Sequence, residues 1–147
     1  MEVARKVFQT YFRDNSNPLV RHHLDSFRDL LITKIPNFIE GMNPLTLNLG
    51  DTRLIKVYIG GKTADKIKYI PPTDEIGNAI LPHQCRLTNK TYELEIRASI
   101  DIEYIFDKEV VTKSFEDVFI GRIPLMLKSH LCYLSPMSAE ELYEVGE

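Results

Sequence analysis

The residues best suited to chemistry in this 147-residue chain are two His-x-Cys pairs, His83 with Cys85 and His130 with Cys132. In a strand, residues two apart share a face, so the four side chains could supply a tetrahedral zinc site. Zinc sites more often use Cys-x2-Cys or His-x3-5-His spacing. We therefore favour two buried thiols beside two surface imidazoles, and we assign no metal ligand.

Three further groups of polar residues could suggest a site. His22 and His23 stand beside Asp25 on an expected helix, but no nucleophile is recognisable nearby in the sequence. Residues 60–63 (Gly-Gly-Lys-Thr) lack the upstream glycine of a phosphate-binding loop. Four carboxylates on one face of a long expected strand could bind a hard cation, namely Glu93, Glu95, Asp101 and Glu103. A solvated surface explains each group better, and we predict no catalytic residue.

Basic residues gather at one place, in an expected loop that holds Lys62, Lys66 and Lys68. Such a cluster could contact a phosphate backbone, but Asp65 within it and the overall acidity favour a merely solvated loop. The chain has 18 basic and 21 acidic residues, a formal net charge of -3. A stand-alone nucleic-acid binder usually carries a basic excess, so any DNA contact would be local or supplied by a larger assembly.

The first third of the chain is expected to be helical. Apolar residues recur at helical spacing over residues 3–13, and a stronger stripe runs from Val20 to Phe38. The expected boundaries of the second helix are Asn17 as N-cap with Pro18 at the first position, a kink or break near Ile35 caused by Pro36, and an end at Gly41.

Strands should follow, because the period changes to two at Leu45. The clearest alternation runs from Tyr92 to Phe106 and is long enough to require a bend near Ala98-Ser99. The other expected elements are strands 45–49 and 53–59, a mobile loop or ragged hairpin at 62–80, a hairpin turn at 107–108, strands 109–120 and 122–127, and a helix at 139–145 capped by Ser138 and Glu141.

These elements predict an α+β fold, with N-terminal helices packed on a mainly antiparallel sheet and a short C-terminal helix. The length fits a single domain over residues 1–147. The helical stripe should cover the apolar strand face that begins at Tyr92, with Ile123, Leu125 and Leu127 in the same core. Two cysteines, no signal peptide and no apolar run of membrane-spanning length indicate a cytoplasmic or nuclear protein with no membrane partner.

Three stretches carry a family resemblance. Residues 20–27 (VRHHLDSF) with 35–39, residues 81–92 (LPHQCRLTNKTY), and residues 118–129 (VFIGRIPLMLKS) with their continuation resemble the start of the second-largest, beta-like subunit of multisubunit DNA-directed RNA polymerase. The residues of the first stretch are most similar to those in the versions of this subunit encoded by large double-stranded DNA viruses. Thr88 and Lys90 replace a usual arginine and a usual apolar residue, while His83 and Cys85 stand where the family has no metal ligand.

The resemblance implies the first half of the protrusion, a domain on one wall of the DNA cleft, and hence a fragment of a much longer subunit. It implies no catalytic residue in this chain, since the magnesium of the assembled nucleotidyltransferase is held by the largest subunit. Expected partners are the largest subunit, the rest of the second-largest subunit, DNA and initiation factors, in the nucleus or cytoplasm, or in a viral factory or virion. Arg86 and Lys90 then join Lys62, Lys66 and Lys68 as expected contacts with nucleic acid or a partner. The alternative is an independent protein–protein interaction module with a protrusion-like fold.

Overall fold

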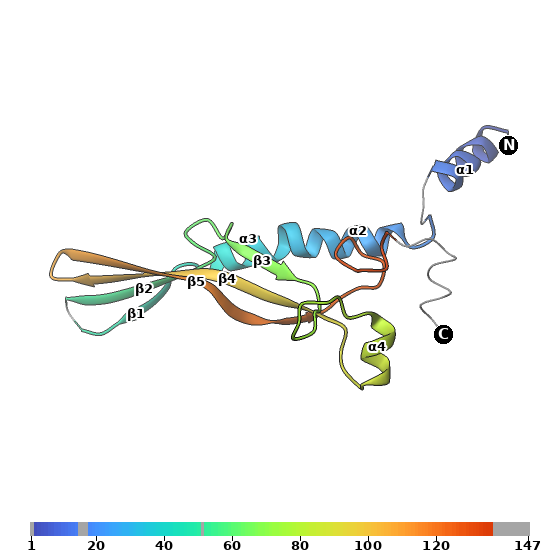
Figure 1. The fold of residues 1–147 in the computed structure, drawn as a ribbon. Helices are drawn as coiled ribbons and strands as arrows, with labels where there is room; N and C mark the ends of the chain where they lie inside the picture. The colour runs from blue at the N-terminus through green and yellow to red at the C-terminus, as the bar shows by residue number, and fades with distance from the viewer. Residues whose placement is uncertain (1, 15–17, 51, 137–147) are drawn as a thin grey trace.

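A long helix lies along one face of a five-stranded antiparallel sheet in the computed structural model (Figure 1). The structure describes residues 2–14, 18–50 and 52–136. The predicted α+β class is confirmed, whereas the expected C-terminal helix at 139–145 and the Asn17 cap lie outside the described residues. In the described ranges no helix is both long and apolar enough to cross a membrane.

The N-terminal third of the chain is helical, as predicted. Helix α1 (Glu2–Asp14) has no buried residue. A second helical rod consists of α2 (Arg21–Asp29), a π-helical segment η1 (Leu30–Lys34) and α3 (Ile35–Met42), which follow without interruption. The predicted start at Pro18 was wrong, because residues 18–20 form a turn and the helix begins at Arg21.

Near Ile35, where a kink or a break was expected, the helix is not broken but contains the π-helical segment at Leu30–Lys34. Proline lacks the N–H that an α-helix interior requires. Here the turn before it is widened into the π segment, and the N–H of Ile35 donates to the carbonyl of Leu30. The helix therefore continues past Pro36 and past Gly41 to Met42. The π-helical turn accommodates the missing N–H of Pro36, so the helix does not end there.

The centre of the sheet is the long strand β4 (Glu93–Phe106), which confirms the alternating pattern. Strand β5 (Glu109–Pro124) pairs with one edge of β4 along its whole length. The other edge is shared by β2 (Arg53–Ile59), which pairs with residues 100–106, and β3 (Ile67–Ile70), which pairs with residues 95–98. Strand β1 (Leu45–Asn48) pairs with β2. The sheet thus has a proximal half containing β3 and a distal half containing β1 and β2.

Residues 60–66 form the turns that join β2 to β3 and place both strands on the same edge of β4. Gly60 and Gly61 take φ values of 75° and 81°, a region that suits glycine. A Cβ on Gly60 would lie 3.1 Å from atoms of Ala64 and Ile67. Residues 62–80 were expected to form a mobile loop or a ragged hairpin. The mobile loop was wrong for part of this segment, because it contains β3 and an isolated antiparallel bridge between Thr73 and Ala79. Strand β3 has only four residues, too few for its alternation to be recognised in the sequence.

The hairpin of β4 and β5 turns at Asp107 and Lys108, as predicted, and both residues have positive φ. The ladder is irregular between Ile96/Arg97 and between Ala98/Ile100, where the bend was expected. Strand β5 passes through Gly121 without a break, so the prediction of two strands at 109–120 and 122–127 was wrong.

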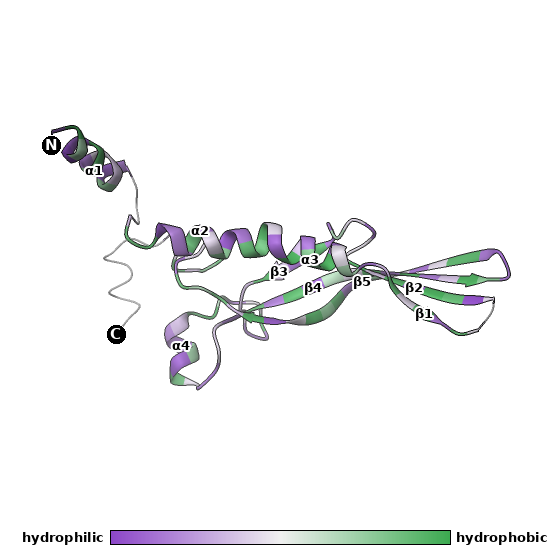
Figure 2. Cartoon of the chain, turned by 180° about the vertical axis from the view of Figure 1, so that it is seen from behind, coloured by the Kyte–Doolittle hydropathy of each residue, from purple (hydrophilic) through white to green (hydrophobic). Residues whose placement is uncertain are grey.

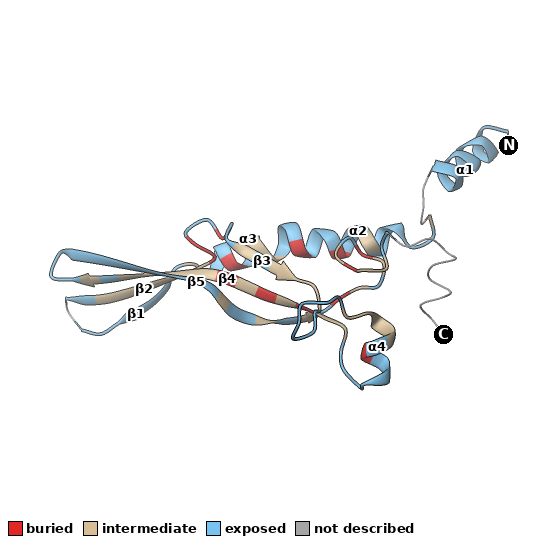
Figure 3. Cartoon of the chain, in the orientation of Figure 1, coloured by how far each residue is buried: buried red, intermediate tan, exposed pale blue. Residues whose placement is uncertain are grey.

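Among the described residues, the core cluster lies in the proximal half of the sheet (Figure 3). Phe27 and Leu31 of the helical rod pack with Leu94, Leu125 and Cys132. The hydroxyl of Tyr69 on β3 donates to the carbonyl of Leu31 at 2.7 Å and joins sheet to helix. Five residues predicted to be in this core are exposed, namely Val20, Phe38, Tyr104, Phe106 and Leu127. Ile123 and Leu125 do belong to it.

Candidate functional site: the polar face of the sheet

The surface opposite the helical rod carries most of the charged side chains of the sheet, and we call it the polar face. Alternate residues of β4 form its middle: Glu93, Glu95, Arg97, Asp101 and Glu103. Because strands in register bring residues of the same face together, these side chains meet polar residues of β2, β3 and β5. The predicted row of carboxylates is therefore confirmed as one face, but it is interleaved with cations from the neighbouring strands.

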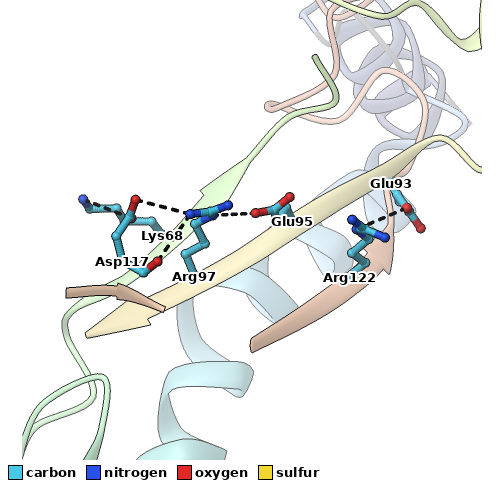
Figure 4. A network of polar contacts seen from close by, with 6 residues as sticks. All are labelled: Lys68, Glu93, Glu95, Arg97, Asp117 and Arg122. Carbon is cyan, nitrogen blue, oxygen red and sulfur yellow. Dashed lines mark hydrogen bonds and ion pairs between the residues drawn. The ribbon is translucent and has the colours of Figure 1, made fainter. Parts of the chain in front are cut away.

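Arg97 is the centre of an ion-pair network on this face (Figure 4). Its Nε donates to Oε1 of Glu95 on the same strand. Its Nη1 lies 3.5 Å from Oδ2 of Asp117 and donates to the Asp117 carbonyl at 3.3 Å. Nζ of Lys68 lies 3.7 Å from Oδ1 of Asp117. The network thus joins β3, β4 and the irregular part of β5, where Asp117 has a φ of 59°.

Two further ion pairs flank this network. Nε of Arg122 lies 3.6 Å from Oε1 of Glu93, and Cζ of Arg122 lies 5.3 Å from the centre of the Phe119 ring. At the other end, Nζ of Lys62 lies 2.7 Å from Oε1 of Glu103. The hydrogen bond from Lys62 lowers the pKa of the Glu103 carboxyl, and the same bond raises the pKa of Lys62. Charges on the polar face are therefore largely neutralised by one another.

The five predicted contact residues fall into separate groups. Lys66 and Lys68 line a depression of about 520 Å³ with Arg97. Lys90 lines another of about 420 Å³, where Arg122 also lies. Arg86 is exposed on α4 (Pro82–Leu87), and Lys62 is held by Glu103.

Sequence reasoning missed Arg97 and Arg122 as members of these depressions. Arg97 interrupts the row of carboxylates on β4, and that interruption was the available signal. The first depression also contains Asp65, Glu116 and Asp117, and the second contains Glu93 and Glu95. The charges that line each depression therefore balance, and neither depression gives the basic stripe of a free nucleic-acid binder.

The zinc hypothesis assumed that His83 and Cys85 lie on a strand and share a face, and this assumption was wrong. His83 and Cys85 lie on α4, a helix that the sequence patterns did not predict. Residues two apart on a helix point to different sides, so this pair does not share a face. Cys85 and Cys132 are both buried free thiols, as expected. Over the described ranges, no three His, Cys, Asp or Glu side chains gather as a metal site would require.

Helix α4 is set by local hydrogen bonds. Pro82 occupies its first turn, and the Gln84 side chain accepts a hydrogen bond from the Leu81 N–H at 2.9 Å. Asn89, with a φ of 53°, turns the chain at its end, and the Lys90 N–H donates to the Cys85 carbonyl at 2.8 Å. The helix thereby fixes the backbone of Lys90 beside the second depression.

The remaining candidate, His22 with His23, lies exposed on α2. The two rings are 4.1 Å apart and tilted by 37°. Burial and the charge of Arg28 lower the pKa of a third histidine, His130, which lies in the turns after β5. Within the described residues no hydrogen bond joins one of these histidines to a serine, threonine or cysteine that it could activate.

The structure thus combines an α+β architecture with a polar face whose charges are paired with one another. Residues 18–147 match the family model described as RNA polymerase beta subunit. The chain therefore belongs to the RNA polymerase beta subunit family, which confirms the resemblance seen in the sequence.

Relatives of known identity come from archaea and eukaryotes. The DNA-directed RNA polymerase subunit Rpo2N of Methanothermobacter thermautotrophicus (strain Delta H) is 33% identical over 129 residues, which cover 88% of this chain and 24% of the relative. Subunit Rpo2 of Saccharolobus shibatae is 32% identical over 145 residues, 97% of this chain and 12% of that protein. The DNA-directed RNA polymerase III subunit RPC2 of Saccharomyces cerevisiae is 31% identical over 134 residues, 88% of this chain and 10% of that protein. The chain thus spans a quarter or less of each of these relatives.

Proposed function

We propose that this chain is the first segment of the second-largest subunit of a DNA-directed RNA polymerase, where it forms part of one wall of the DNA cleft. The observation that carries the proposal is the family match over residues 18–147. The archaeal and yeast relatives are polymerase subunits, and the match occupies only a small share of each. In this proposal residues 1–147 are one domain, the first half of the protrusion, and belong to a longer polypeptide.

The role within that assembly is positioning. The polar face supplies ion pairs that hold β3, β4 and β5 in register, and it contributes no bond chemistry. The magnesium of the assembled enzyme is held by the largest subunit in this proposal. The largest subunit, the rest of the second-largest subunit, DNA and initiation factors are the partners, in the nucleus or cytoplasm. A viral source, with a viral factory or virion as its location, remains a prediction from the spelling of residues 20–27.

Co-purification tests this proposal. An antibody to the chain is used on the source material, and the proteins that accompany it are identified by mass spectrometry. We expect a band several times heavier than 17.0 kDa that travels with the largest polymerase subunit. A native band at 17.0 kDa without polymerase subunits would overturn the proposal and favour the independent interaction module.

Salt dependence tests the proposed DNA contacts. Lys66 and Lys90 are the better candidates, because no ion pair within the described residues holds them, while Lys62 and Lys68 are paired with Glu103 and Asp117. If each lysine neutralises one phosphate in assembled polymerase, Lys66→Ala or Lys90→Ala should lower the slope of log affinity against log salt by about 1. Lys108→Ala, at the tip of the hairpin, is the control. Unchanged slopes for both lysines would exclude them as phosphate-binding residues.

A further inference from the structure

The carbonyl of Leu31, in the π segment of the helical rod, receives its hydrogen bond from outside the helix. The Ile35 N–H donates to the Leu30 carbonyl, so the π pattern assigns the next donor, at position 36, to the Leu31 carbonyl. Position 36 is a proline, which has no N–H. The hydroxyl of Tyr69 on β3 donates to this carbonyl instead, at 2.7 Å. The phenol thus replaces the donor that Pro36 lacks.

This replacement matters because the Leu31 carbonyl is shielded from water. Leu31 has 0% exposure, and a buried backbone carbonyl without a donor is destabilising. Tyr69 is held by its own strand, where it lies opposite Ile96 of β4. Leu31, Pro36 and Tyr69 also line one depression of about 370 Å³. The replacement donor therefore comes from a fixed position in the sheet, close to the proline.

The residues buried along the rod show what the π segment changes. In a continuous α-helix Phe38 would lie within about 20° of Phe27 around the axis, and Ile39 would lie about 120° away. The apolar stripe that ends at Phe38 was predicted on that basis. In the structure Ile39 is 7% exposed and Phe38 is 67% exposed. Figure 2 shows hydrophobic residues along the rod, but near its end the buried one is Ile39.

A π turn accounts for this shift. Its hydrogen bonds span five residues instead of four, so it takes up one residue more than an α turn. Residues after the π turn are therefore displaced by about one position around the helix axis. Ile39 thereby occupies the place that Phe38 would take in a continuous α-helix. The register of the helix decides which of these two apolar side chains is buried.

We infer that Pro36 and Tyr69 form a register lock, a pair of residues that holds the rod in its π form. Pro36 disfavours the α form, because its ring would collide with the carbonyl of the residue four positions before it. Tyr69 favours the π form, because in the α form the Ile35 N–H would donate to the Leu31 carbonyl and the phenol would lose its acceptor. The lock selects Ile39 for burial and leaves the Phe38 ring exposed.

A double-mutant cycle in the 147-residue chain tests whether Tyr69 replaces the donor of Pro36. Urea unfolding measures stability and shows that each variant is folded. We expect Tyr69→Phe alone to raise the unfolding equilibrium constant by about two- to tenfold. In the Pro36→Ala background, where position 36 has an N–H, the same change should raise it by less than about twofold. Equal effects in the two backgrounds would overturn the inference.

Tyr58→Phe is the matched control for the loss of a phenol hydroxyl. The Tyr58 hydroxyl lies 3.4 Å from Oε2 of Glu103, away from the rod. Its removal should have the same effect with proline or alanine at position 36. An effect that depends on position 36 as strongly as that of Tyr69→Phe would overturn the assignment of the lock to Tyr69.

Thiol labelling tests the register itself. Phe38→Cys and Ile39→Cys are made separately, and peptide mass spectrometry distinguishes their labelling from that of the two buried native thiols. In the otherwise unchanged chain, the cysteine at position 38 should label faster than the one at position 39. When Pro36→Ala and Tyr69→Phe are combined, we expect the ratio of these rates to fall by about tenfold or more, because a buried thiol labels only through local opening.

An unchanged labelling ratio in the combined variant would overturn the inference, since the packing of Ile39 alone would then set the register. The stability cycle needs neither cysteine variant. It therefore decides the inference if Ile39→Cys does not fold. Neither measurement depends on the proposed function, so failure of the lock would leave that proposal standing.

Discussion

The proximal and distal halves of the sheet share one central strand but differ in what covers them. In the proximal half, Leu94 of β4 is fully buried under Phe27 and Leu31 of the helical rod. In the distal half, Tyr104 and Phe106 of the same strand are exposed. On β4 the alternation of apolar and polar residues runs from Glu93 through both halves as far as Tyr104, and it ends at Ile105. The comparison shows that alternation selects the face to be buried, whereas a second layer is needed to bury it.

The largest difference between the halves should appear when a core residue is truncated. Leu31 has 0% exposure, so Leu31→Ala should reduce the free energy of unfolding of the 147-residue chain by about 2–5 kcal/mol. Urea unfolding followed by circular dichroism measures it. The neighbouring Leu30→Ala is the control, because Leu30 is 37% exposed and should cost less. Equal losses for the two leucines would show that the helical rod is not packed as described. For Phe27→Ala we expect the same loss of unfolding free energy as for Leu31→Ala, about 2–5 kcal/mol.

The hydrogen bond between β3 and the helical rod should have a smaller effect. Tyr69→Phe removes the donor to the Leu31 carbonyl and should cost about 0.5–1.5 kcal/mol. Burial raises the pKa of Tyr69 above its ordinary value of 10.0, so the folded state favours the neutral phenol. The wild-type advantage should therefore be complete below pH 10 and decline as pH rises through the raised pKa. Urea unfolding at neutral and alkaline pH checks this, and no difference from wild type at neutral pH would contradict the bond.

The ion-pair network should contribute less still. Arg97→Gln removes contacts with Glu95 and Asp117, but the Arg97 side chain is 35% exposed. Exposed pairs contribute roughly 0.2–1 kcal/mol, and salt screens them. Unfolding in low and high salt measures the effect, with Arg86→Gln as the control on exposed α4. A loss that does not shrink with salt would indicate that Arg97 acts through packing.

The smallest effect is expected in the distal half. Ile100 lies on the strand face that was expected to be covered by the helical stripe, but it is only half-buried. For Phe115→Ala, at 45% exposure, we expect a change within about 0.5 kcal/mol in the 147-residue chain. Urea unfolding at several protein concentrations checks it. A large, concentration-dependent loss would mean that two copies of the chain cover each other's distal faces.

Much of the fold could be predicted from periodicity and turn chemistry. The alternation from Tyr92 to Phe106 identified β4, and Asp107-Lys108 identified the hairpin turn. Two short elements were missed. Strand β3 has four residues and depends on pairing with β4, and α4 has six and depends on the Gln84 cap. Such elements are too short to show a period, so their local sequence does not distinguish them from loops.

The candidate site was predicted less well than the fold. The polar face of β4 followed from alternation, but its cations come from distant positions in the chain. Arg97 meets Asp117, and Lys62 meets Glu103. Strand register and the turn at Gly60 determine which residues pair. Neither can be recognised from the local sequence around the three lysines. Lys62 and Lys68 therefore looked more available for contact than they are.

The sequence by itself determined the family, the fold class and the two faces of the central strand, because these depend on motifs and on a period of two that is written locally. Only the tertiary structure decided that β2 and β3 share one edge of β4, that the helical rod passes Pro36 and stops at Asn43, and that the apolar face is consequently half covered. The physical reason is that burial and charge pairing are contacts between distant segments. A sequence pattern indicates which side chains need such contacts, and the geometry of the folded chain determines which of them are made.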